Sequence, residues 1–294
     1  MITIRVPATT ANLGPGFDCL GMALDLYARF SFEITKKGLD ITGCDPALAR
    51  PDNLVYQAFL AALKHYDVKP DGLRLHIQSD IPQARGLGSS AACITGGILG
   101  ANALYQLGMD DQAVFELACA LEGHPDNIAP ALFGGLRVSM MEGGLPHQLP
   151  AAVHPSWRVL ALIPDFSLTT EAARAALPAL VSLGDACYNL SHAAFLLKAL
   201  EQDDPTLLRL ACRDRLHQDA RFALIPGGRQ LKEKAEDIGA AACWLSGAGP
   251  TLICLYQNSD FPARLEPVIA AVFPRFAMTP LALCHAGAVV ERIT

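Results

Sequence analysis

Residues 82–92 read PQARGLGSSAA, a glycine-rich loop that runs directly into an apolar segment. Glycine lacks a Cβ atom, so the backbone amides at Gly86 and Gly88 can turn toward an anion and approach it closely. The first turn of the helix predicted next leaves N–H groups unpaired and carries roughly half a positive charge. The stretch therefore predicts a loop that binds a polyphosphate at the N-terminus of a helix.

Three other kinds of loop can contain a similar sequence. A helix capped by Ser89 or Ser90 after a glycine turn would bind nothing, and this alternative stays open. The dinucleotide-binding spacing G-x-G-x-x-G/A also fits, but that motif directly follows a strand, whereas the expected strand at 73–77 ends well before Gly86. A P-loop is excluded, because no Gly-Lys-Ser or Gly-Lys-Thr follows a glycine at the required spacing.

The composition favours a folded enzyme that binds a small anion. Of the 294 residues, 51% are hydrophobic and 18% are charged, which excludes a disordered chain. The formal charge of -6 disfavours binding to nucleic acid or to an anionic membrane, so an anionic ligand needs local donors. A small phosphorylated molecule is therefore a better candidate ligand than a polymer.

The cysteines and the first residues indicate the compartment. The nine cysteines lie mostly in apolar runs without a C-x-x-C pair, which is typical of core residues under reducing conditions. We see no signal-peptide pattern and no apolar run of the length that spans a membrane. We therefore expect a cytoplasmic protein without a disulfide framework or a zinc site.

Two domains of mixed α and β structure are expected from the length and the hydrophobic pattern. Alternating apolar residues predict early strands at 2–6, 30–34 and 73–77. Helical spacing predicts helices at 53–65, 89–105 and 110–121. The second half should contain several helices and strands at 157–163, 240–245 and 251–256. Turn residues at 142–156 indicate a domain crossing, so we place the domains at 1–150 and 151–294.

Three further segments carry chemistry-bearing residues among turn formers. Residues 7–18 read PATTANLGPGFD and are expected to form a long ordered connection after the first strand. Residues 122–127 read EGHPDN and combine two carboxylates, an imidazole and an amide directly after a helix. Residues 246–251 read SGAGPT, which alone is only a glycine hairpin. If Glu122 lies near Ser90 and a polyphosphate, the two side chains would complete a magnesium site of oxygen ligands.

Together these segments, in this order, resemble the GHMP kinase superfamily, and within it the members that phosphorylate L-homoserine. The resemblance spans almost the whole chain. It implies an α+β GHMP kinase fold, with an N-terminal α+β domain that contains a left-handed βαβ crossover and a C-terminal ferredoxin-like domain. It also implies ATP-dependent phosphorylation of the homoserine side-chain hydroxyl, in threonine biosynthesis, with ATP and Mg²⁺ bound between the domains. Relatives are often dimers, so a homodimer is possible.

The resemblance also assigns roles to individual residues. The phosphate loop would use Arg85, Gly86, Leu87, Gly88, Ser89, Ser90 and Ala91. Ser90 and Glu122 would bind Mg²⁺, and Asn53 resembles a position near adenine, although a helix-capping role explains it equally well. Arg174 and Arg221 would bind the homoserine carboxylate, because a guanidinium meets a carboxylate with two parallel bonds. The residues around the amino group and the reacting hydroxyl would be Asn12, Asp18, His124 and Asp126.

The catalytic base is the point at which the resemblance is incomplete. Asn127 stands where several members of the superfamily place an aspartate, and an amide cannot take up a proton at neutral pH. We therefore expect catalysis by alignment and charge stabilisation, with the proton passing to Asp126 or directly to phosphate. The catalytic set is thus Ser90, Glu122, Asp126 and Asn127. Ala84 replaces a common glycine, and the short segment between Glu122 and His124 could shift Glu122.

Two alternative functions are compatible with the same motifs. A related kinase for a mevalonate-like or sugar alcohol would keep the phosphate loop and change the pocket, whereas the paired arginines favour an amino acid. A nucleotide-binding regulator without catalysis would bind ATP without turnover, and the presence of both Ser90 and Glu122 argues against it.

Overall fold

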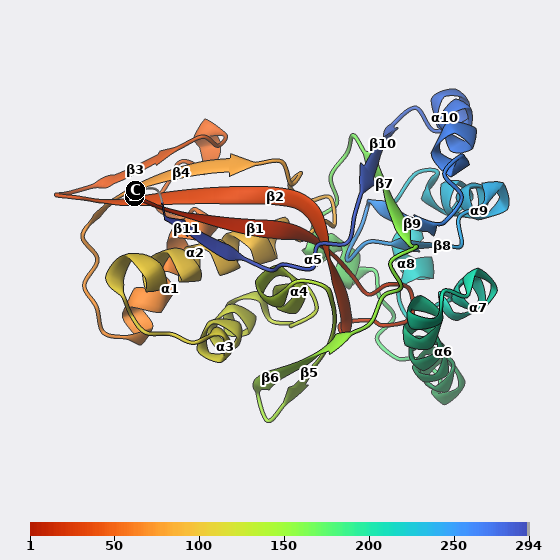
Figure 1. The fold of residues 1–294 in the computed structure, drawn as a ribbon, viewed down its shortest axis with the longest axis horizontal. Coiled ribbons are helices and arrows are strands. Elements are labelled where there is room, and N and C mark those ends of the chain that lie inside the picture. The colour runs from red at the N-terminus through yellow and green to blue at the C-terminus, as the bar shows by residue number, and fades with distance from the viewer. Residues whose placement is uncertain (293–294) are drawn as a thin grey trace.

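The computed structural model describes residues 1–292, which form two β-sheets with helices packed against them (Figure 1). The first sheet has the strand order β11-β1-β2-β4-β3, with β5 paired to β2 and β6 paired to β5. Its strands are β1 (Ile2–Ala11), β2 (Leu20–Thr35), β3 (Leu39–Thr42), β4 (Gly72–Ser79), β5 (Leu136–Glu142), β6 (Leu145–Ala151) and β11 (Val289–Arg292). The helices associated with it are η1 (Pro46–Leu48), α1 (Leu54–His65), α2 (Ser89–Tyr105), α3 (Asp111–Glu122) and α4 (Ile128–Phe133).

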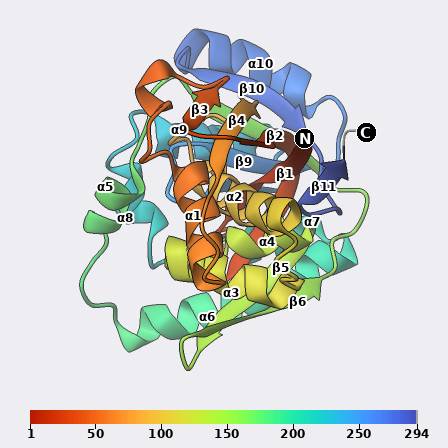
Figure 2. The same cartoon turned by 90° about the vertical axis from the view of Figure 1, so that its left-hand side faces the viewer.

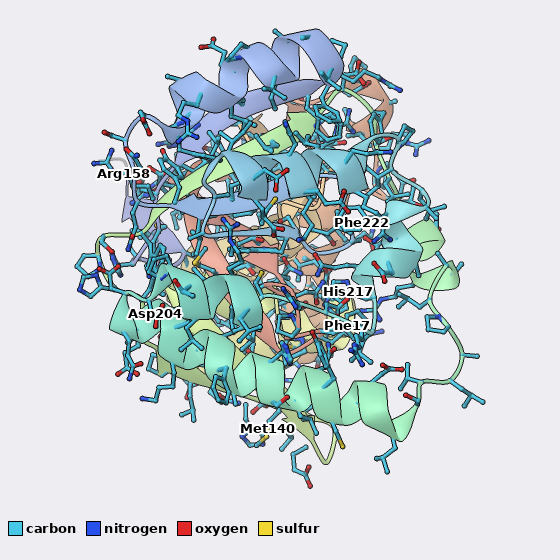
Figure 3. The ribbon with its side chains drawn as sticks, turned by 90° about the vertical axis from the view of Figure 1, so that its right-hand side faces the viewer. Phe17, Met140, Arg158, Asp204, His217 and Phe222 are labelled. Carbon is cyan, nitrogen blue, oxygen red and sulfur yellow. The ribbon has the colours of Figure 1, made fainter. Side chains whose placement is uncertain are left out.

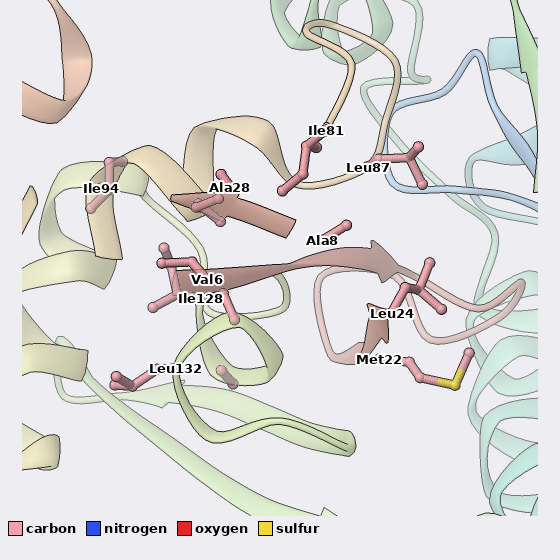
Figure 4. Close-up of a cluster of buried hydrophobic side chains, with 14 of the residues drawn as sticks. Val6, Ala8, Met22, Leu24, Ala28, Ile81, Leu87, Ile94, Ile128 and Leu132 are labelled. Atoms are coloured by element: carbon pink, nitrogen blue, oxygen red, sulfur yellow. The ribbon is translucent and has the colours of Figure 1, made fainter. Parts of the chain in front are cut away.

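The central helix of this part is α2, as its all-round apolar sequence predicts. It packs against α1, α3, α4, β1 and β2. A Cβ on Gly96 or Gly100 would come within 2.4 Å of the Phe30 or Phe32 ring, so the missing side chains let the helix approach β2. Figure 4 shows part of the buried cluster beneath this sheet, including Ile94 from α2. The start of α2, where the phosphate loop ends, is therefore held rigidly.

The second sheet has the order β10-β7-β9-β8, and every pair is antiparallel. Its strands are β7 (Arg158–Pro164), β8 (Ala242–Leu245), β9 (Leu252–Tyr256) and β10 (Phe276–Leu281). Its helices are α5 (Thr170–Ala175), α6 (Leu183–Gln202), α7 (Pro205–Ala211), α8 (Gln218–Phe222), α9 (Gly228–Ile238) and α10 (Phe261–Val272). One helical connection joins β7 to β8, a hairpin joins β8 to β9, and α10 joins β9 to β10. This is the expected ferredoxin-like arrangement, so that prediction is confirmed.

The predicted strands and helices of both halves are present, but β2 begins at Leu20 rather than at residue 30, residues 145–151 of the expected domain crossing form β6, and β1 is longer than expected. Residues 7–11 were expected to belong to a connection, but β1 continues to Ala11. The pairing with β2 shifts register between Pro7 and Ala8, and a strand tolerates proline at such a bulge. Thr9 and Thr10 are fully buried, so this polar stretch resembles a loop in sequence although it is a core strand.

The division expected between 150 and 151 falls at the last residue of β6, just before the connection to β7, which belongs to the other sheet. However, β11 returns from the second half and pairs with β1, so the two terminal strands lie side by side (Figure 2). One hydrophobic cluster also includes residues of both sheets, for example Phe30 and Trp244. A single cut in the sequence therefore does not separate the two sheets, and the proposed bounds stay a prediction.

Within the first sheet, β3 and β4 are parallel neighbours, and α1 connects them in the sequence. These three elements form the βαβ unit for which the crossover was expected. Across residues 1–292, we find no helix with both the length and the apolar character needed to cross a membrane.

Candidate active site

The glycine-rich loop is fixed between the end of β1 and the hairpin that joins β8 to β9. The Thr9 amide donates to the Leu87 carbonyl at 3.1 Å, and the Ser246 hydroxyl donates to the Gly86 carbonyl at 2.6 Å. Arg85 donates from Nε and Nη2 to the carbonyls of Pro164 and Asp165, both at 3.0 Å. The loop is therefore tied to both sheets.

Glycine is required in this loop by both conformation and space. Gly86 and Gly88 have φ of +75° and +70°, in the left-handed region that side chains disfavour. A Cβ on Gly88 would lie 1.9 Å from Thr9 Oγ1, and one on Gly86 would lie 2.3 Å from the Ser246 carbonyl oxygen. Gly88 is also the N-cap of α2, so the alternative in which Ser89 or Ser90 caps the helix is wrong.

Ser90 and Glu122 are in contact at the N-terminus of α2. Ser90 lies in the first turn of α2 and Glu122 is the last residue of α3, and the Ser90 hydroxyl donates to Glu122 Oε2 at 2.6 Å. The short segment after Glu122 therefore does not carry its carboxylate away from the phosphate loop. A hydroxyl and a carboxylate are hard oxygen ligands, which Mg²⁺ prefers, so this donor set fits the expected ion.

The EGHPDN segment provides a buried carboxylate with its partners. Asp126 is 2% exposed, and its Oδ1 lies 2.6 Å from His124 Nδ1 and 3.3 Å from Asn127 Nδ2. Burial opposes protonation of His124, but the hydrogen bond and charge of Asp126, with Glu122 and Asp18 nearby, raise the pKa of the imidazole above its ordinary value. The Thr9 hydroxyl donates to Asn127 Oδ1 at 2.8 Å and fixes that amide.

Asp18 and Arg174, which are far apart in the sequence, form a bidentate ion pair. Arg174 Nη1 and Nη2 donate to the two oxygens of Asp18 at 3.2 and 3.0 Å. Asn12 holds the loop behind this pair, because its Oδ1 accepts from the Asp18 amide and its Nδ2 donates to the Gly247 carbonyl. One carboxylate oxygen from each of Asp18 and Asp126 and one imidazole nitrogen of His124 lie within 4.8 Å of one another. The site thus has an acidic cluster next to a cation.

Arg221 supplies a second cation, which is almost fully buried. Its Nη1 donates to the Gly247 carbonyl at 2.9 Å. Burial is the main reason that its pKa falls to about 10, and the charge of Arg174 lowers it further. Arg221 is therefore still charged at neutral pH, and a bound anion next to this buried charge would stabilise it.

These groups line one cavity of about 120 Å³. Of the residues selected from the sequence, it brings together Asn12, Asp18, Arg85, Gly86, Gly88, Ser89, Ser90, Glu122, His124, Asp126, Asn127, Arg174 and Arg221. Three selected residues do not line it. Leu87 and Ala91 point into the hydrophobic core. Asn53 caps α1, accepting from the amides of Val55 and Tyr56 and donating to the Leu48 carbonyl. Its role near adenine stays a prediction.

The cavity also has walls that were given no role from the sequence. These are Ala84, Leu168, Thr170 and residues 247–249. Residues 247–249 belong to the SGAGPT segment noted in the sequence, but only the fold places that segment against Gly86. Leu168 and Thr170 belong to no motif; Thr170 begins α5, the helix that carries Arg174, and the placement of α5 brings both residues to the cavity.

Comparisons with known proteins agree over the whole chain. The family model described as "GHMP kinases N terminal domain" matches residues 53–135, and "GHMP kinases C terminal" matches residues 196–274. A homoserine kinase of Clostridium botulinum (strain Loch Maree / Type A3) is 39% identical over 293 residues, covering 99% of each chain. A homoserine kinase of Clostridium beijerinckii is 40% identical over 293 residues, covering 99% of this chain and 98% of its own.

Solved structures show the same similarity. A homoserine kinase from Cytophaga hutchinsonii superposes with a TM-score of 0.88 at 27% identity, covering 99% of this chain and 97% of that one. A putative homoserine kinase from Listeria monocytogenes gives 0.82 at 30% identity, with both chains fully covered. The mevalonate kinase of L. major shares the fold, with a TM-score of 0.72 at 17% identity over 96% of each chain.

Proposed function

The chain belongs to the homoserine kinase family of the GHMP kinases, and we propose that it transfers the γ-phosphoryl group of ATP to the side-chain hydroxyl of L-homoserine. The products are ADP and O-phospho-L-homoserine, in a step of threonine biosynthesis. Identity of 39–40% to homoserine kinases over the full chain supports the assignment. The arrangement of charges in the cavity supports it independently.

The Asp18–Arg174 ion pair is the observation that best supports homoserine as the substrate. Homoserine is a zwitterion, so its ammonium can replace Arg174 as the partner of Asp18, while its carboxylate replaces Asp18 as the partner of Arg174. Arg221 adds a second cation for the carboxylate. Mevalonate has a carboxylate that could take Arg174 but no ammonium for Asp18, so it would leave Asp18 without a partner, whereas a sugar alcohol has neither charge and could not replace either member of the ion pair.

The other end of the cavity suits the polyphosphate of ATP. Gly86, Gly88, Ser89 and Ser90 line it, where a glycine-rich loop ends at a helix N-terminus whose unpaired amides would bind an anion. Ser90 and Glu122 would hold Mg²⁺ through their oxygens. A bound ion there offsets the negative charge of the transferred phosphoryl group.

The transfer itself requires mainly alignment. The homoserine hydroxyl oxygen forms a bond to the γ-phosphorus, the bond from phosphorus to the bridging oxygen of ADP breaks, and the hydroxyl proton passes to Asp126 or to the phosphoryl oxygens. Asp126 is oriented for this by His124 and Asn127. The Asn127 amide cannot accept the proton but positions its neighbours.

A coupled assay of ADP release tests the proposal with L-homoserine, mevalonate and a sugar alcohol as acceptors, with and without Mg²⁺. We expect turnover with homoserine alone, dependent on Mg²⁺. Turnover of mevalonate or of the sugar alcohol in preference to homoserine would identify a different kinase, and ATP binding without turnover of any acceptor would identify a regulator. The cytoplasmic location and the possible homodimer stay predictions.

A further inference from the structure

His217 lies behind the cavity, where it contacts the groups that form the site but does not line it. Its side chain is fully buried, and it precedes α8, the short helix that carries Arg221. The Phe17 ring stacks on it, with ring centroids 5.1 Å apart and an angle of 29° between the planes. Figure 3 shows Phe17 and His217 side by side between α6 and α8.

The hydrogen bonds of His217 require one particular tautomer. Nε2 lies 2.8 Å from the Gly14 carbonyl oxygen, which can only accept, so Nε2 carries a hydrogen. Nδ1 lies 3.2 Å from Arg221 Nη1, which can only donate, so Nδ1 presents its lone pair. Both partners are therefore satisfied by the neutral imidazole, and a second proton on Nδ1 would point at the guanidinium.

The electrostatic surroundings favour the same neutral form. Burial is the main cause of a lowered His217 pKa, and the positive charge of Arg221 lowers it further, although Asp214 acts in the opposite direction. Asp214 Oδ2 lies 3.8 Å from Nε2, which is beyond hydrogen-bond distance. Its oxygens instead accept from Asn189 and from the amides of residues 216–218.

A neutral acceptor has a specific consequence for Arg221. A carboxylate at this position would hold the guanidinium equally well, but it would pair with the charge and compete with an anionic ligand. The imidazole fixes Nη1 together with the Gly247 carbonyl and adds no negative charge of its own, so among the described residues no carboxylate pairs directly with Arg221. Arg221 and Arg174 also lie 5.2 and 5.9 Å from the centroid of the Phe17 ring, which His217 supports from behind.

We propose that His217 is a positioning residue that fixes the Arg221 guanidinium, through Nδ1 and through Phe17, for the carboxylate of the amino-acid substrate. This inference rests on the proposed function, because it concerns the substrate group that Arg221 binds. It adds to the homoserine site a buried acceptor that touches neither substrate nor ATP.

Two substitutions separate the functions of the two ring nitrogens. In His217→Asn the side-chain oxygen can take the place of Nδ1 and accept from Arg221, but nothing reaches Gly14. In His217→Gln the longer amide can reach Gly14, but the acceptor at Nδ1 is lost. We expect His217→Gln to raise KM for homoserine roughly tenfold or more, with KM for ATP unchanged, and His217→Asn to retain most of the affinity. His65→Gln, at an exposed histidine of α1, serves as the control.

A second readout distinguishes positioning from general damage to the fold. The inhibition constant of 3-aminopropan-1-ol, which has the ammonium and the hydroxyl but no carboxylate, should be unchanged in His217→Gln. In an Arg221→Lys background the same substitution should have little further effect, because the two residues act as one unit. Equal losses in both His217 variants, or a parallel loss of 3-aminopropan-1-ol and ATP affinity, would overturn the proposal.

The tautomer can be measured without any substrate. Nitrogen-15 NMR of the ligand-free protein should show His217 as the neutral form with hydrogen on Nε2 at neutral pH. An imidazolium or the Nδ1–H form would contradict the proposal directly. If instead the wild-type protein does not phosphorylate homoserine while this tautomer is observed, the proposed function has failed and the hydrogen-bond arrangement has not.

Discussion

Glu122 owes its position to the end of α3, where its carboxylate accepts the Ser90 hydroxyl at 2.6 Å. We predict that Glu122→Gln lowers kcat by about 100-fold or more, because a neutral amide replaces the charged oxygen ligand proposed for Mg²⁺. Titration of activity with Mg²⁺ measures the effect, which should include a higher Mg²⁺ requirement. Glu116→Gln, on the same helix, is the control and should be near wild type. Unchanged Mg²⁺ dependence in Glu122→Gln would remove this residue from the metal site.

Asp214 organises the turn before α8 by accepting four hydrogen bonds with a side chain that is fully buried. Burial alone would raise its pKa, but the neighbouring His217 and these donors outweigh burial and hold the pKa below the ordinary 3.8. A lowered pKa in the folded state means that the stabilisation is complete above pH 3.8 and is lost as the pH falls through the folded-state value.

We therefore predict that Asp214→Asn lowers the free energy of unfolding by about 1–3 kcal/mol at pH 7, because the new amide N–H₂ opposes backbone donors. Urea denaturation across a pH series measures the difference from wild type, which should shrink below pH 3.8. Asp219→Asn, at an exposed position of α8, should change little at any pH. A difference that stays constant down to acid pH would show that the carboxylate charge is not the cause.

The junction of the glycine loop with α2 depends on one close approach to β1. We predict that Gly88→Ala raises KM for ATP by about tenfold or more, because a Cβ would lie 1.9 Å from Thr9 Oγ1 and the loop would have to move. Gly108→Ala is a matched control, since Gly108 has a similar φ of +74° but no atom within 4 Å of the added Cβ.

Both glycine variants share the cost of a left-handed alanine, about 1–2 kcal/mol, so thermal unfolding should show a loss of stability in each. Only Gly88→Ala should change the affinity for ATP, measured by steady-state kinetics and by calorimetry with a non-hydrolysable analogue. If Gly108→Ala has the same effect on KM, backbone strain rather than the position of the loop is responsible.

The two sheets meet through Thr10 at the end of β1. Its Oγ1 accepts from Trp244 Nε1 at 3.0 Å and lies 2.9 Å from Ser246 Oγ, which in turn donates to the Gly86 carbonyl. We predict that Thr10→Val destabilises the protein by about 1–3 kcal/mol, because it leaves the buried indole N–H without a partner. The KM for ATP should also rise, since the chain of contacts ends on the phosphate loop.

Thr95→Val is the control for this substitution. Thr95 is equally buried in α2, but its hydroxyl has no hydrogen-bond partner among the described residues, so its loss should be neutral or stabilising. Denaturant unfolding and kinetics on both variants compare the two buried hydroxyls. A neutral Thr10→Val would mean that the sheets are held together by apolar packing alone.

The sequence by itself determined most of the helices and strands around the site and, through its resemblance to the GHMP kinases, most of the residues that line it. The strands and helices follow from apolar periodicity, and the phosphate loop follows from glycines whose conformational freedom is a local property. The polar segments that contain Asn12, Asp18, His124 and Asp126 are visible in the sequence, but the resemblance to the GHMP kinases is what assigned these residues to the substrate. The motifs that carry the resemblance extend over a few residues each, so they can be identified without knowing the fold.

Only the tertiary structure decided how those segments meet. The partners Asp18 and Arg174 are far apart in the chain, as are Gly86 and Ser246, and no local pattern pairs them. The return of β11 to β1 and the burial of Thr9 and Thr10 also run against the local reading of the sequence. The role of His217 depends on bonds to Gly14 and Arg221 at once. Its surroundings therefore exist only after both sheets have packed, because the chemistry of a buried group is set by neighbours that the fold supplies.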